Sequence, residues 1–161
     1  MIREENAADI PAIKNVVLAA FGQTEEAGLV DALRQSGDTA LSLVAEEDGE
    51  ITGHILFSIL QAPEGYLALA PVCVTPTRQN KGIGSELIIE GLAKAKHDGW
   101  QGVFVLGEPN YYQRFGFSVE MADRFETPYP KPYFMALELV PDALAQRSGE
   151  IIYAAPFLAL G

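Results

Sequence analysis

A short polar segment between an apolar strand and an apolar helix has the composition of an anion-binding site. It reads Gln79-Asn80-Lys81-Gly82-Ile83-Gly84-Ser85 and follows the apolar run that ends at Val74. Glycine has no Cβ, so at Gly82 and Gly84 the backbone can approach a phosphate closely, and the free N–H groups at the start of the next helix face the anion. Lys81 adds a mobile positive charge. These residues predict a site for a phosphate or a pyrophosphate.

Two common phosphate-binding motifs do not fit the segment. In a P-loop the lysine follows the second glycine, whereas Lys81 precedes Gly82. A dinucleotide-binding fingerprint needs a third glycine or an alanine three residues after Gly84, and that position is Leu87. The segment therefore predicts phosphate binding by a different loop.

The pattern of apolar residues places this segment in a mixed α/β sheet. Helices are expected from a cap at Asp9 to Gly22, from Thr24 to near Gly37, over 84–97 and over 109–115. Strands are expected in a hairpin over 40–60 that turns at Asp48-Gly49, and over 66–74, 101–106, 133–140 and 150–154. The order of elements predicts one domain over residues 1–161 with a twisted sheet of about seven strands and about four helices.

Length and charge exclude several classes of protein. The chain has 161 residues and a net charge of −11, which argues against binding to nucleic acid or to an anionic membrane. The single cysteine, Cys73, excludes an intramolecular disulfide and a multi-cysteine metal site. The N-terminal residues lack the pattern of a secretory signal, and no apolar run reaches the ~18 residues of a membrane helix. We expect a cytoplasmic protein that needs no metal.

The motifs resemble those of the GNAT superfamily of acyltransferases, which bind acetyl-coenzyme A. Residues 79–84 fit its Gln/Arg-x-x-Gly-x-Gly/Ala signature, Val72-Cys73-Val74 stands at its usual strand, and Tyr112-Gln113-Arg114-Phe115-Gly116-Phe117 is similar to its closing motif. Residues 107–112 look like a bacterial subgroup of predicted N-acetyltransferases. The likeness covers nearly the whole chain in element order. It implies a single-domain acyl-CoA N-acyltransferase fold with splayed central strands.

The resemblance also implies roles for individual residues. Backbone groups of Val72, Cys73 and Val74 would bind the pantetheine arm and the acetyl carbonyl, beside a neighbouring strand that begins near Gly102. The pyrophosphate would be held by Gln79, Asn80, Lys81, Gly82, Ile83, Gly84 and Ser85. Tyr112 matches the tyrosine that in many members donates a proton to the leaving thiolate. Many relatives carry an asparagine seven residues before it, where this chain has Val105, and Asn110 is the candidate replacement.

The chemistry expected of such a site needs few groups. An amine must lose a proton before it attacks a thioester, the oxyanion needs an N–H donor, and the thiolate benefits from an acid. The reference pKa of a phenol, ~10, is close to that of a thiol, ~8.5. A tyrosine can therefore protonate the leaving thiolate and still remain un-ionised at neutral pH. We therefore expect direct transfer to a primary amine in a ternary complex, and a stable acetyl-enzyme on Cys73 would contradict this.

The proton path leaves alternatives open. Tyr112 could instead be a packing residue, with Tyr111 as the fallback acid. His54 lies among apolar residues and is expected to be a satisfied strand histidine rather than a base. Glu26 and Glu108 are the candidate bases, although each could equally be a helix-end or surface charge. A base that acts through ordered water is a further alternative.

Two other functions and an unidentified acceptor stay open. The chain could be a non-catalytic sensor of acyl-coenzyme A, or it could use a longer acyl group or an oxygen acceptor. The acceptor pocket would be built from the first two helices and from residues 61–66 and 124–133, where aromatic residues could wall it or simply connect strands. The late strands could also pair with a second copy, so a homodimer is compatible with the sequence.

The distribution of charge suggests the kind of acceptor. Residues 72–117 carry five basic and four acidic side chains, a balance of +1, whereas residues 1–71 carry −9 and residues 118–161 carry −3. The acidity therefore spares the segment expected to hold a polyanionic cosubstrate. This distribution favours a cationic acceptor.

Overall fold

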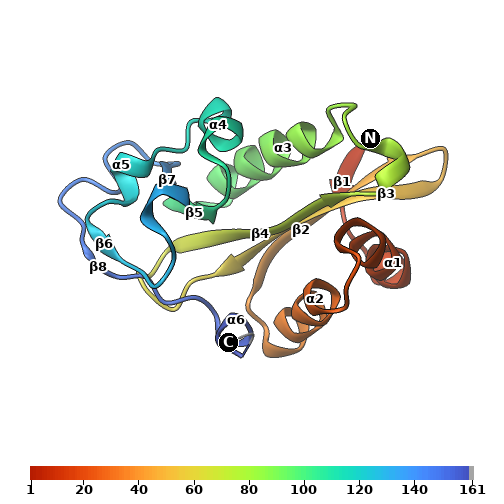
Figure 1. The fold of residues 1–161 in the computed structure, drawn as a ribbon, viewed down its shortest axis with the longest axis horizontal. Helices are drawn as coiled ribbons and strands as arrows, with labels where there is room; N and C mark the ends of the chain where they lie inside the picture. The colour runs from red at the N-terminus through yellow and green to blue at the C-terminus, as the bar shows by residue number, and fades with distance from the viewer. Residues whose placement is uncertain (160–161) are drawn as a thin grey trace.

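A computed structural model describes residues 1–159, which form a mixed six-stranded sheet and a small two-stranded one (Figure 1). The large sheet has the order β1-β2-β3-β4-β5-β7, and in it β4 and β5 run parallel whereas the other neighbouring pairs are antiparallel. Its strands are β1 (Ile2–Glu4), β2 (Thr39–Glu47), β3 (Glu50–Ile59), β4 (Tyr66–Val74), β5 (Gly102–Leu106) and β7 (Phe134–Glu138). The small sheet pairs β6 (Phe125–Glu126) with β8 (Gly149–Glu150).

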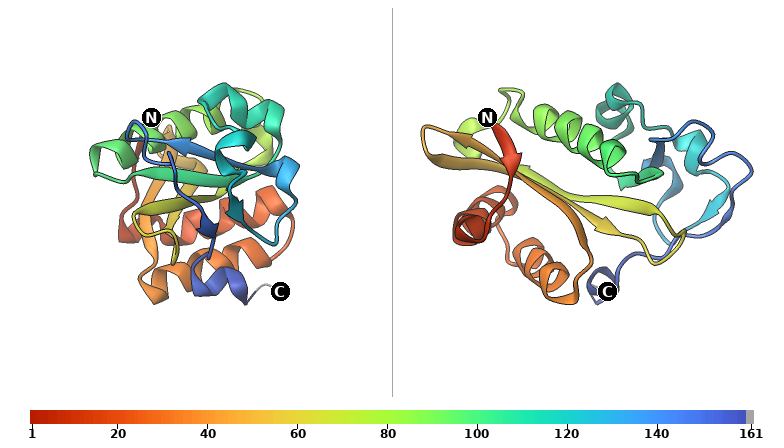
Figure 2. Two further views of the ribbon diagram at one scale, coloured as in Figure 1. Left: turned by 90° about the vertical axis from the view of Figure 1, so that its left-hand side faces the viewer. Right: turned by 180° about the vertical axis from the view of Figure 1, so that it is seen from behind.

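The helices cover both faces of the large sheet. Figures 1 and 2 show α1 (Ile10–Phe21) and α2 (Glu25–Ser36) on one face and α3 (Ile83–His97) on the other. Short helices complete the chain: α4 (Pro109–Tyr112), α5 (Val119–Ala122), α6 (Ala155–Leu158), and the 3-10 turns η1 (Ala7–Asp9), η2 (Pro76–Arg78), η3 (Gln113–Phe115) and η4 (Lys131–Tyr133). Within residues 1–159, none of the helices combines the length and the apolar character that crossing a membrane requires.

The alternation of side chains along β3 divides the core between the two faces. Ile55 and Phe57 pack with Leu87 and Ile88 of α3 in the largest apolar cluster. Leu56, which points to the opposite face, packs with residues of α2. Successive side chains of a strand point to opposite faces of the sheet, and here each face is covered by helices. The middle of the sheet is therefore apolar on both faces.

Most expected elements are confirmed. The hairpin of β2 and β3 turns at Asp48 and Gly49, which have φ of 52° and 80°, as the type I′ turn that matches strand twist requires. The expected helix over 109–115 is present as α4 followed by η3. The mixed α/β class is therefore confirmed, with the strands divided into six and two.

Two local expectations are wrong. The strand expected over 150–154 ends at Glu150, because Ile152 makes one isolated bridge to Ala62 and Tyr153 is buried in an aromatic cluster. The side chain of Asp9 does not cap α1. Its carboxylate instead accepts hydrogen bonds from Arg3, at 2.7 Å, and from the backbone N–H of Asn6, which closes a capping box on η1. The ion pair with Arg3 thus holds the carboxylate that was expected to cap α1.

Phe57 fits into a notch that Gly91 leaves in α3. A Cβ on Gly91 would lie 2.5 Å from Cε1 of Phe57, whose side chain is fully buried. No such contact occurs between real atoms, so a larger residue would have to displace the ring or the helix. The notch therefore fixes how closely α3 approaches the sheet.

Replacing Gly91 with alanine should lower the free energy of unfolding by about 1–2 kcal/mol, because overpacking outweighs the gain in helix propensity. Gly28→Ala in α2 is the matched control. Nothing lies within 4 Å of its added Cβ, so the free energy of unfolding should rise by about 0.5–1 kcal/mol. Urea unfolding followed by circular dichroism measures both values. A Gly91→Ala protein as stable as the parent would contradict the close contact.

Candidate functional site

The two central strands separate part-way along their length. β4 and β5 pair from Tyr66 opposite Gly102 to Ala68 opposite Phe104, and no further. The register between β3 and β4 shifts opposite Ala70 and Pro71, and Pro71 has no N–H for a ladder. Beyond this point residues 72–74 of β4 keep their pairing with β3 but have lost β5. The splay therefore exposes an unpaired strand edge inside the fold.

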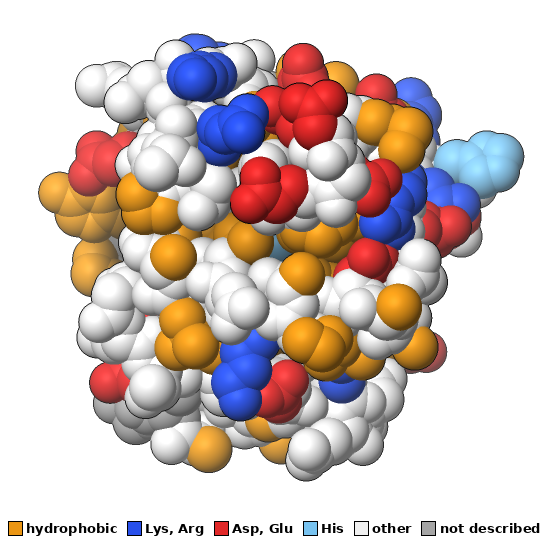
Figure 3. Space-filling model, turned by 90° about the vertical axis from the view of Figure 1, so that its right-hand side faces the viewer, with side chains coloured by type: hydrophobic (Ala, Val, Ile, Leu, Met, Phe, Trp, Pro, Cys, Tyr) orange, Lys and Arg blue, Asp and Glu red, His pale blue; other side chains and the backbone are white. Residues whose placement is uncertain are grey.

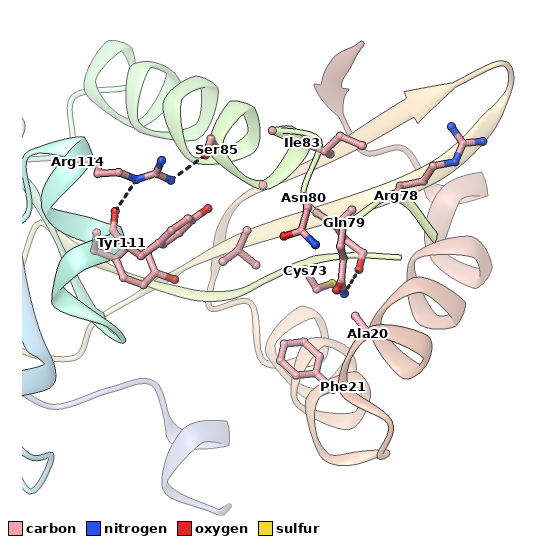
Figure 4. Close-up of a pocket in the computed structure, with 15 residues that line it drawn as sticks. Ala20, Phe21, Cys73, Arg78, Gln79, Asn80, Ile83, Ser85, Tyr111 and Arg114 are labelled. Atoms are coloured by element: carbon pink, nitrogen blue, oxygen red, sulfur yellow. Dashed lines mark hydrogen bonds between the residues drawn. The ribbon is translucent and has the colours of Figure 1, made fainter. Parts of the chain in front are cut away.

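A pocket of about 730 Å³ occupies the region beyond the splay (Figure 4). Its walls come from the end of α1, residues 72–74 of β4, the loop after η2, the first turn of α3, and the segment from Tyr111 to Arg114. These elements are far apart in the sequence, so the topology of the sheet brings them together. The pocket is bordered by both the strand edge and a helix N-terminus, so it offers backbone groups to a ligand with an anionic part.

The loop before α3 leaves its backbone donors free. Asn80 and Gly82 have φ of 66° and 85°, and no side chain caps the first turn of α3. Gln79 Nε2 donates to the carbonyl oxygen of Val74 at 3.1 Å, which ties the loop to β4. Because the first N–H groups of a helix lack partners within it, they are available to an anion in the pocket.

Arg114 brings a positive charge to the same wall. Its Nη2 donates to Ser85 Oγ at 3.2 Å and its Nε donates to the carbonyl oxygen of Tyr111 at 3.3 Å, as Figure 4 shows. The guanidinium lies 4.6 Å from the centre of the Tyr111 ring. These contacts orient a cation beside the first turn of α3, where a phosphate would be bound.

Tyr112 is wedged against the end of β5. Its ring packs edge-on against Tyr111, with centroids 5.1 Å apart, and against Phe117 at 5.9 Å. A Cβ at Gly107 would overlap the Tyr112 ring, so the absence of a side chain there makes room for the phenol. Burial and the neighbouring Tyr111 raise the pKa of Tyr112 to about 12. The phenol therefore stays protonated throughout the neutral range.

Cys73 is the thiol in the opposite wall. It lies in β4 and is 7% exposed. Burial raises the pKa of Cys73 to about 12, and a hydrogen bond from the backbone of His54 opposes that shift only in part. The thiol is thus protonated at neutral pH, although it borders the pocket.

The structure brings most of the expected site residues together. One pocket is lined by Val72, Cys73, Val74, Gln79, Asn80, Gly82, Ile83, Gly84, Ser85 and Tyr112. Four expected residues lie outside this lining: Lys81, Asn110 and Glu108 are exposed, and Glu26 is held on α2 by the Gln23 amide at 3.1 Å. Their expected roles stay predictions.

Of the other lining residues, Tyr111 was expected only as the fallback acid, and the rest were not singled out from the sequence. Ala20 and Phe21 close one end of the pocket, and Arg78, Tyr111 and Arg114 complete it. Tyr111 and Arg114 flank the matched tyrosine, Tyr112. The position of Arg114 in the Tyr112 motif was therefore the sequence signal that could have placed its charge in the site. Nothing in the local pattern marks Phe21, because its position depends on how α1 packs on β4.

Two expectations about packing are also decided. Tyr129 does not line the pocket, because its ring packs on Phe134 at 6.0 Å and on Tyr153 at 5.2 Å in a separate core. His54 is fully buried, as expected, with Nε2 2.7 Å from Ser42 Oγ. Its Nδ1, however, has no hydrogen-bond partner among residues 1–159, so the expectation of a satisfied histidine is wrong for one of its two nitrogens.

Comparison with known proteins gives a consistent set of relatives. The model of the acetyltransferase (GNAT) family matches residues 10–117. YjhQ of Escherichia coli K12, described as an uncharacterized N-acetyltransferase, is 39% identical over 134 residues, which cover 78% of this chain and 74% of YjhQ. YhbS of the same strain, described in the same words, is 31% identical over 159 residues and 95% of each chain.

Solved structures agree with these sequences. The crystal structure of YhbS from Escherichia coli in complex with CoA superposes with a TM-score of 0.93 and covers 100% of this chain and 93% of that one. A GNAT family acetyltransferase from Brucella melitensis in complex with acetyl-CoA is 40% identical, with a TM-score of 0.83 and coverage of 98% and 97%.

Cys73 should react slowly with thiol reagents in the folded protein. At pH 8 a thiol with a pKa near 12 is about one part in 10,000 thiolate, against roughly a quarter for an ordinary thiol. We expect the reaction with Ellman's reagent to be roughly 1,000-fold slower than in guanidinium, and absorbance kinetics measure it directly because the chain has one cysteine. A native rate within tenfold of the unfolded one would contradict the burial of this thiol.

Proposed function

The chain belongs to the acetyltransferase (GNAT) family, and on that premise we propose that it transfers the acetyl group of acetyl-coenzyme A directly to a primary amine, with Tyr112 as the general acid. One observation carries the proposal. The unpaired edge of β4, the glycine loop before α3 and the Tyr112 phenol all border a single pocket. These are the groups that the thioester carbonyl, the pyrophosphate and the leaving thiolate of acetyl-coenzyme A would need.

The phosphate end would bind at α3. Backbone N–H groups from Asn80 to Ser85 would face the pyrophosphate, since Gly82 and Gly84 place no Cβ in the way. Arg114, held by Ser85 and Tyr111, would add a charge-assisted hydrogen bond from the other side. Lys81 is exposed beside the loop and would contribute a screened charge rather than a contact.

The acyl end would bind along β4. Backbone groups of Val72, Cys73 and Val74 that face the splay have no partner in β5, so they would pair with the amide groups of the pantetheine arm. One N–H of this edge would donate to the thioester carbonyl and stabilise the oxyanion of the tetrahedral intermediate. Acetyl-coenzyme A supplies the activated acyl group, and the chain supplies position, charge stabilisation and proton transfer.

The acidity of Tyr112 suits a leaving group in the same environment. A phenol with a pKa of about 12 would be a poor donor to a thiolate in water. Cys73, in the opposite wall of this pocket, shows that burial raises the pKa of a thiol to about 12 as well. Burial would raise the pKa of the coenzyme A thiol in the same way. The pKa values of the proton donor and of the proton acceptor would then match in the pocket where the transfer takes place.

Transfer would not pass through the cysteine of the protein. The thiolate is the nucleophilic form of cysteine, and the raised pKa of Cys73 keeps it a thiol at neutral pH. Direct attack by the amine in a ternary complex is therefore the proposed route. The acyl chain that the pocket prefers is not set by these residues.

The acceptor is proposed to be cationic. It would enter near Phe21, at the end of the pocket formed by α1. Glu25 and Glu26 begin α2 shortly after this residue and place two negative charges near that end. On the face shown in Figure 3, acidic side chains lie interspersed with basic ones. Glu26 and Glu108 stay candidate members of the proton path.

Arg114→Gln should weaken coenzyme A binding about tenfold, because one charge-assisted hydrogen bond contributes about 1.5 kcal/mol. The loss should be larger at low salt, where the charge is less screened. Calorimetric titration measures the dissociation constant. The matched control is Arg147→Gln, since Arg147 lies 5.5 Å from the Tyr66 ring, outside the lining. Equal affinity of the Arg114 variant and the parent would remove Arg114 from the site.

Tyr112→Phe should lower the rate of thiol release from acetyl-coenzyme A with an amine panel by about 100-fold, because it removes the acid and keeps the ring. Coenzyme A affinity should stay within threefold. Tyr133→Phe, at an exposed tyrosine, is the matched control. If Tyr111→Phe rather than Tyr112→Phe abolishes the rate, the acid is assigned to the wrong tyrosine. If the parent binds coenzyme A and releases no thiol with any amine, the protein is an acyl-coenzyme A sensor.

A further inference from the structure

A buried histidine with one unused nitrogen lies directly behind the pocket wall. His54 of β3 is 0% exposed, and its Nδ1 is a buried polar atom with no hydrogen-bond partner among residues 1–159. A buried polar atom of this kind is costly unless something uses it. The proposed reaction needs a proton acceptor, and the unused nitrogen of His54 has the lone pair for that role.

The hydrogen bonds around the ring fix where its proton lies. The Ser42 hydroxyl donates to Oε1 of Glu5 and has one proton to give. Ser42 Oγ therefore accepts from His54 Nε2, at 2.7 Å, and Glu5 Oε1 lies 3.7 Å from the same nitrogen. Nε2 must carry the proton, since both of its neighbours are acceptors. In the neutral ring Nδ1 is then unprotonated and has a free lone pair, as a general base requires.

The same cluster can stabilise a proton on that lone pair. Glu5 is paired with Arg34 of α2, whose Nη2 and Nε lie 2.5 and 3.2 Å from its two oxygens. Burial opposes ionisation of Glu5, but hydrogen bonds from His54, Arg34 and Ser42 outweigh it and lower its pKa to about 2. A carboxylate is thus linked through Ser42 to the ring. Positive charge on the imidazole would be offset through this chain.

His54 lies on the strand next to the pocket wall. His54 is paired in register with Cys73 of β4, and Cys73 lines the pocket. Nε2 is directed to Ser42 on β2, and the two nitrogens of an imidazole point in widely divergent directions. The pairing of His54 with Cys73 places the ring directly behind the wall that Cys73 forms. Cys73 thus lies between the His54 ring and the pocket.

The surroundings define which charges act on the ring. The titratable or charged groups that face it are Glu5 after β1, Arg34 of α2 and Cys73 of β4. From α1 the apolar side chains of Ile13 and Val17 pack in the cluster that contains Cys73. Burial lowers the pKa of His54 below its usual 6.5; Glu5 opposes that effect, and the charge of Arg34 adds to it. The ring is neutral at neutral pH.

The arrangement is not that of a serine nucleophile. In a serine–histidine–acid triad the acid bonds to Nδ1 and the serine to Nε2. Here Glu5 accepts from Ser42 itself, and Ser42 is 8% exposed and lies outside the pocket lining. The free position of the cluster is the ring nitrogen, so its chemistry is proton transfer.

We propose that Nδ1 of His54 accepts, through a water molecule beside Cys73, the proton that the acceptor ammonium must lose before it attacks the thioester. The inference rests on the proposed acetyl transfer. The ammonium becomes a neutral amine and His54 an imidazolium. The amine nitrogen then bonds to the acetyl carbon, the carbon–sulfur bond breaks, and the thiolate takes the proton of Tyr112. The nitrogen gives its second proton to the Tyr112 phenolate, and His54 releases its proton to solvent.

His54→Gln tests the base, because glutamine can still donate to Ser42 but has no lone pair of comparable basicity. The probes are methylamine, which is charged at pH 7.5, and hydroxylamine, which is similar in size and uncharged there. We expect thiol release with methylamine to fall about 100-fold, and with hydroxylamine to fall by less than about fivefold. His97→Gln, at the exposed histidine, is the matched control. Coenzyme A affinity and far-ultraviolet circular dichroism verify folding.

The outcomes separate the two proposals. Equal losses with both probes, or no loss with methylamine, would overturn the role of His54 and leave acetyl transfer standing. If the parent releases no thiol with either probe or with the amine panel, acetyl transfer fails. Nitrogen-15 NMR of the histidine rings then decides the inference alone, because a proton on Nδ1 at neutral pH would overturn it.

A second variant covers the case in which His54→Gln does not fold. Glu5→Gln keeps the size of the side chain and removes the charge that favours the imidazolium. With methylamine, the rate should fall on the acid side as His54 becomes protonated, below pH 6.5. Glu5→Gln should move that limb to lower pH. An unchanged acid limb would overturn the coupling of Glu5 to His54.

Discussion

The loss of pairing between β4 and β5 is the constraint on which the rest of the site depends. Strands that diverge within a folded core leave backbone N–H and C=O groups without partners, which is costly unless a ligand or solvent satisfies them. The chain separates these strands after Ala68 and places Pro71, which has no N–H, at the irregularity. The remaining features follow from that opening. The first turn of α3 borders the opening, and the segment after β5 contributes Tyr111 and Tyr112 to its wall.

The paired parts of β4 and β5 share two cores, one on each face of the sheet. Leu67 and Leu69 of β4 pack with Val103 and Val105 of β5 in the cluster that contains α3. Tyr66 and Ala68 of β4 pack with Phe104 of β5 in the aromatic cluster formed with β7 and the late segments. Phe104 of β5 packs on Phe125 and Phe134 with centroids 5.2 and 5.5 Å apart. Because these shared cores hold the paired residues together, the splay is confined to the residues after Ala68 and Phe104.

The parts of the site that could be predicted from the sequence are those encoded locally. Glycines at the start of α3 and a tyrosine before a Gly-Phe pair are short patterns whose spacing reports backbone conformation. Glu26 and Glu108 were candidates because of their charge, and charge does not reveal whether a side chain faces a cavity. The free nitrogen of His54 depends on Glu5, Ser42 and the register of three strands. Long-range pairing of this kind has no local signature, and the same applies to Ile152, whose bridge to Ala62 replaced an expected strand.

The notch at Gly91 has a consequence for recognition as well as for packing. Phe57 enters it and so sets the rotation of α3 about its own axis. The residues at the start of that helix lie eight positions earlier, about 12 Å along the axis. The rotation of α3 about its axis therefore also sets the direction of the N–H groups in its first turn. The direction of the proposed anion site is thus set by a contact between a ring and a glycine in the middle of the core, so a core substitution far from the pocket would change how the first turn of α3 meets a phosphate.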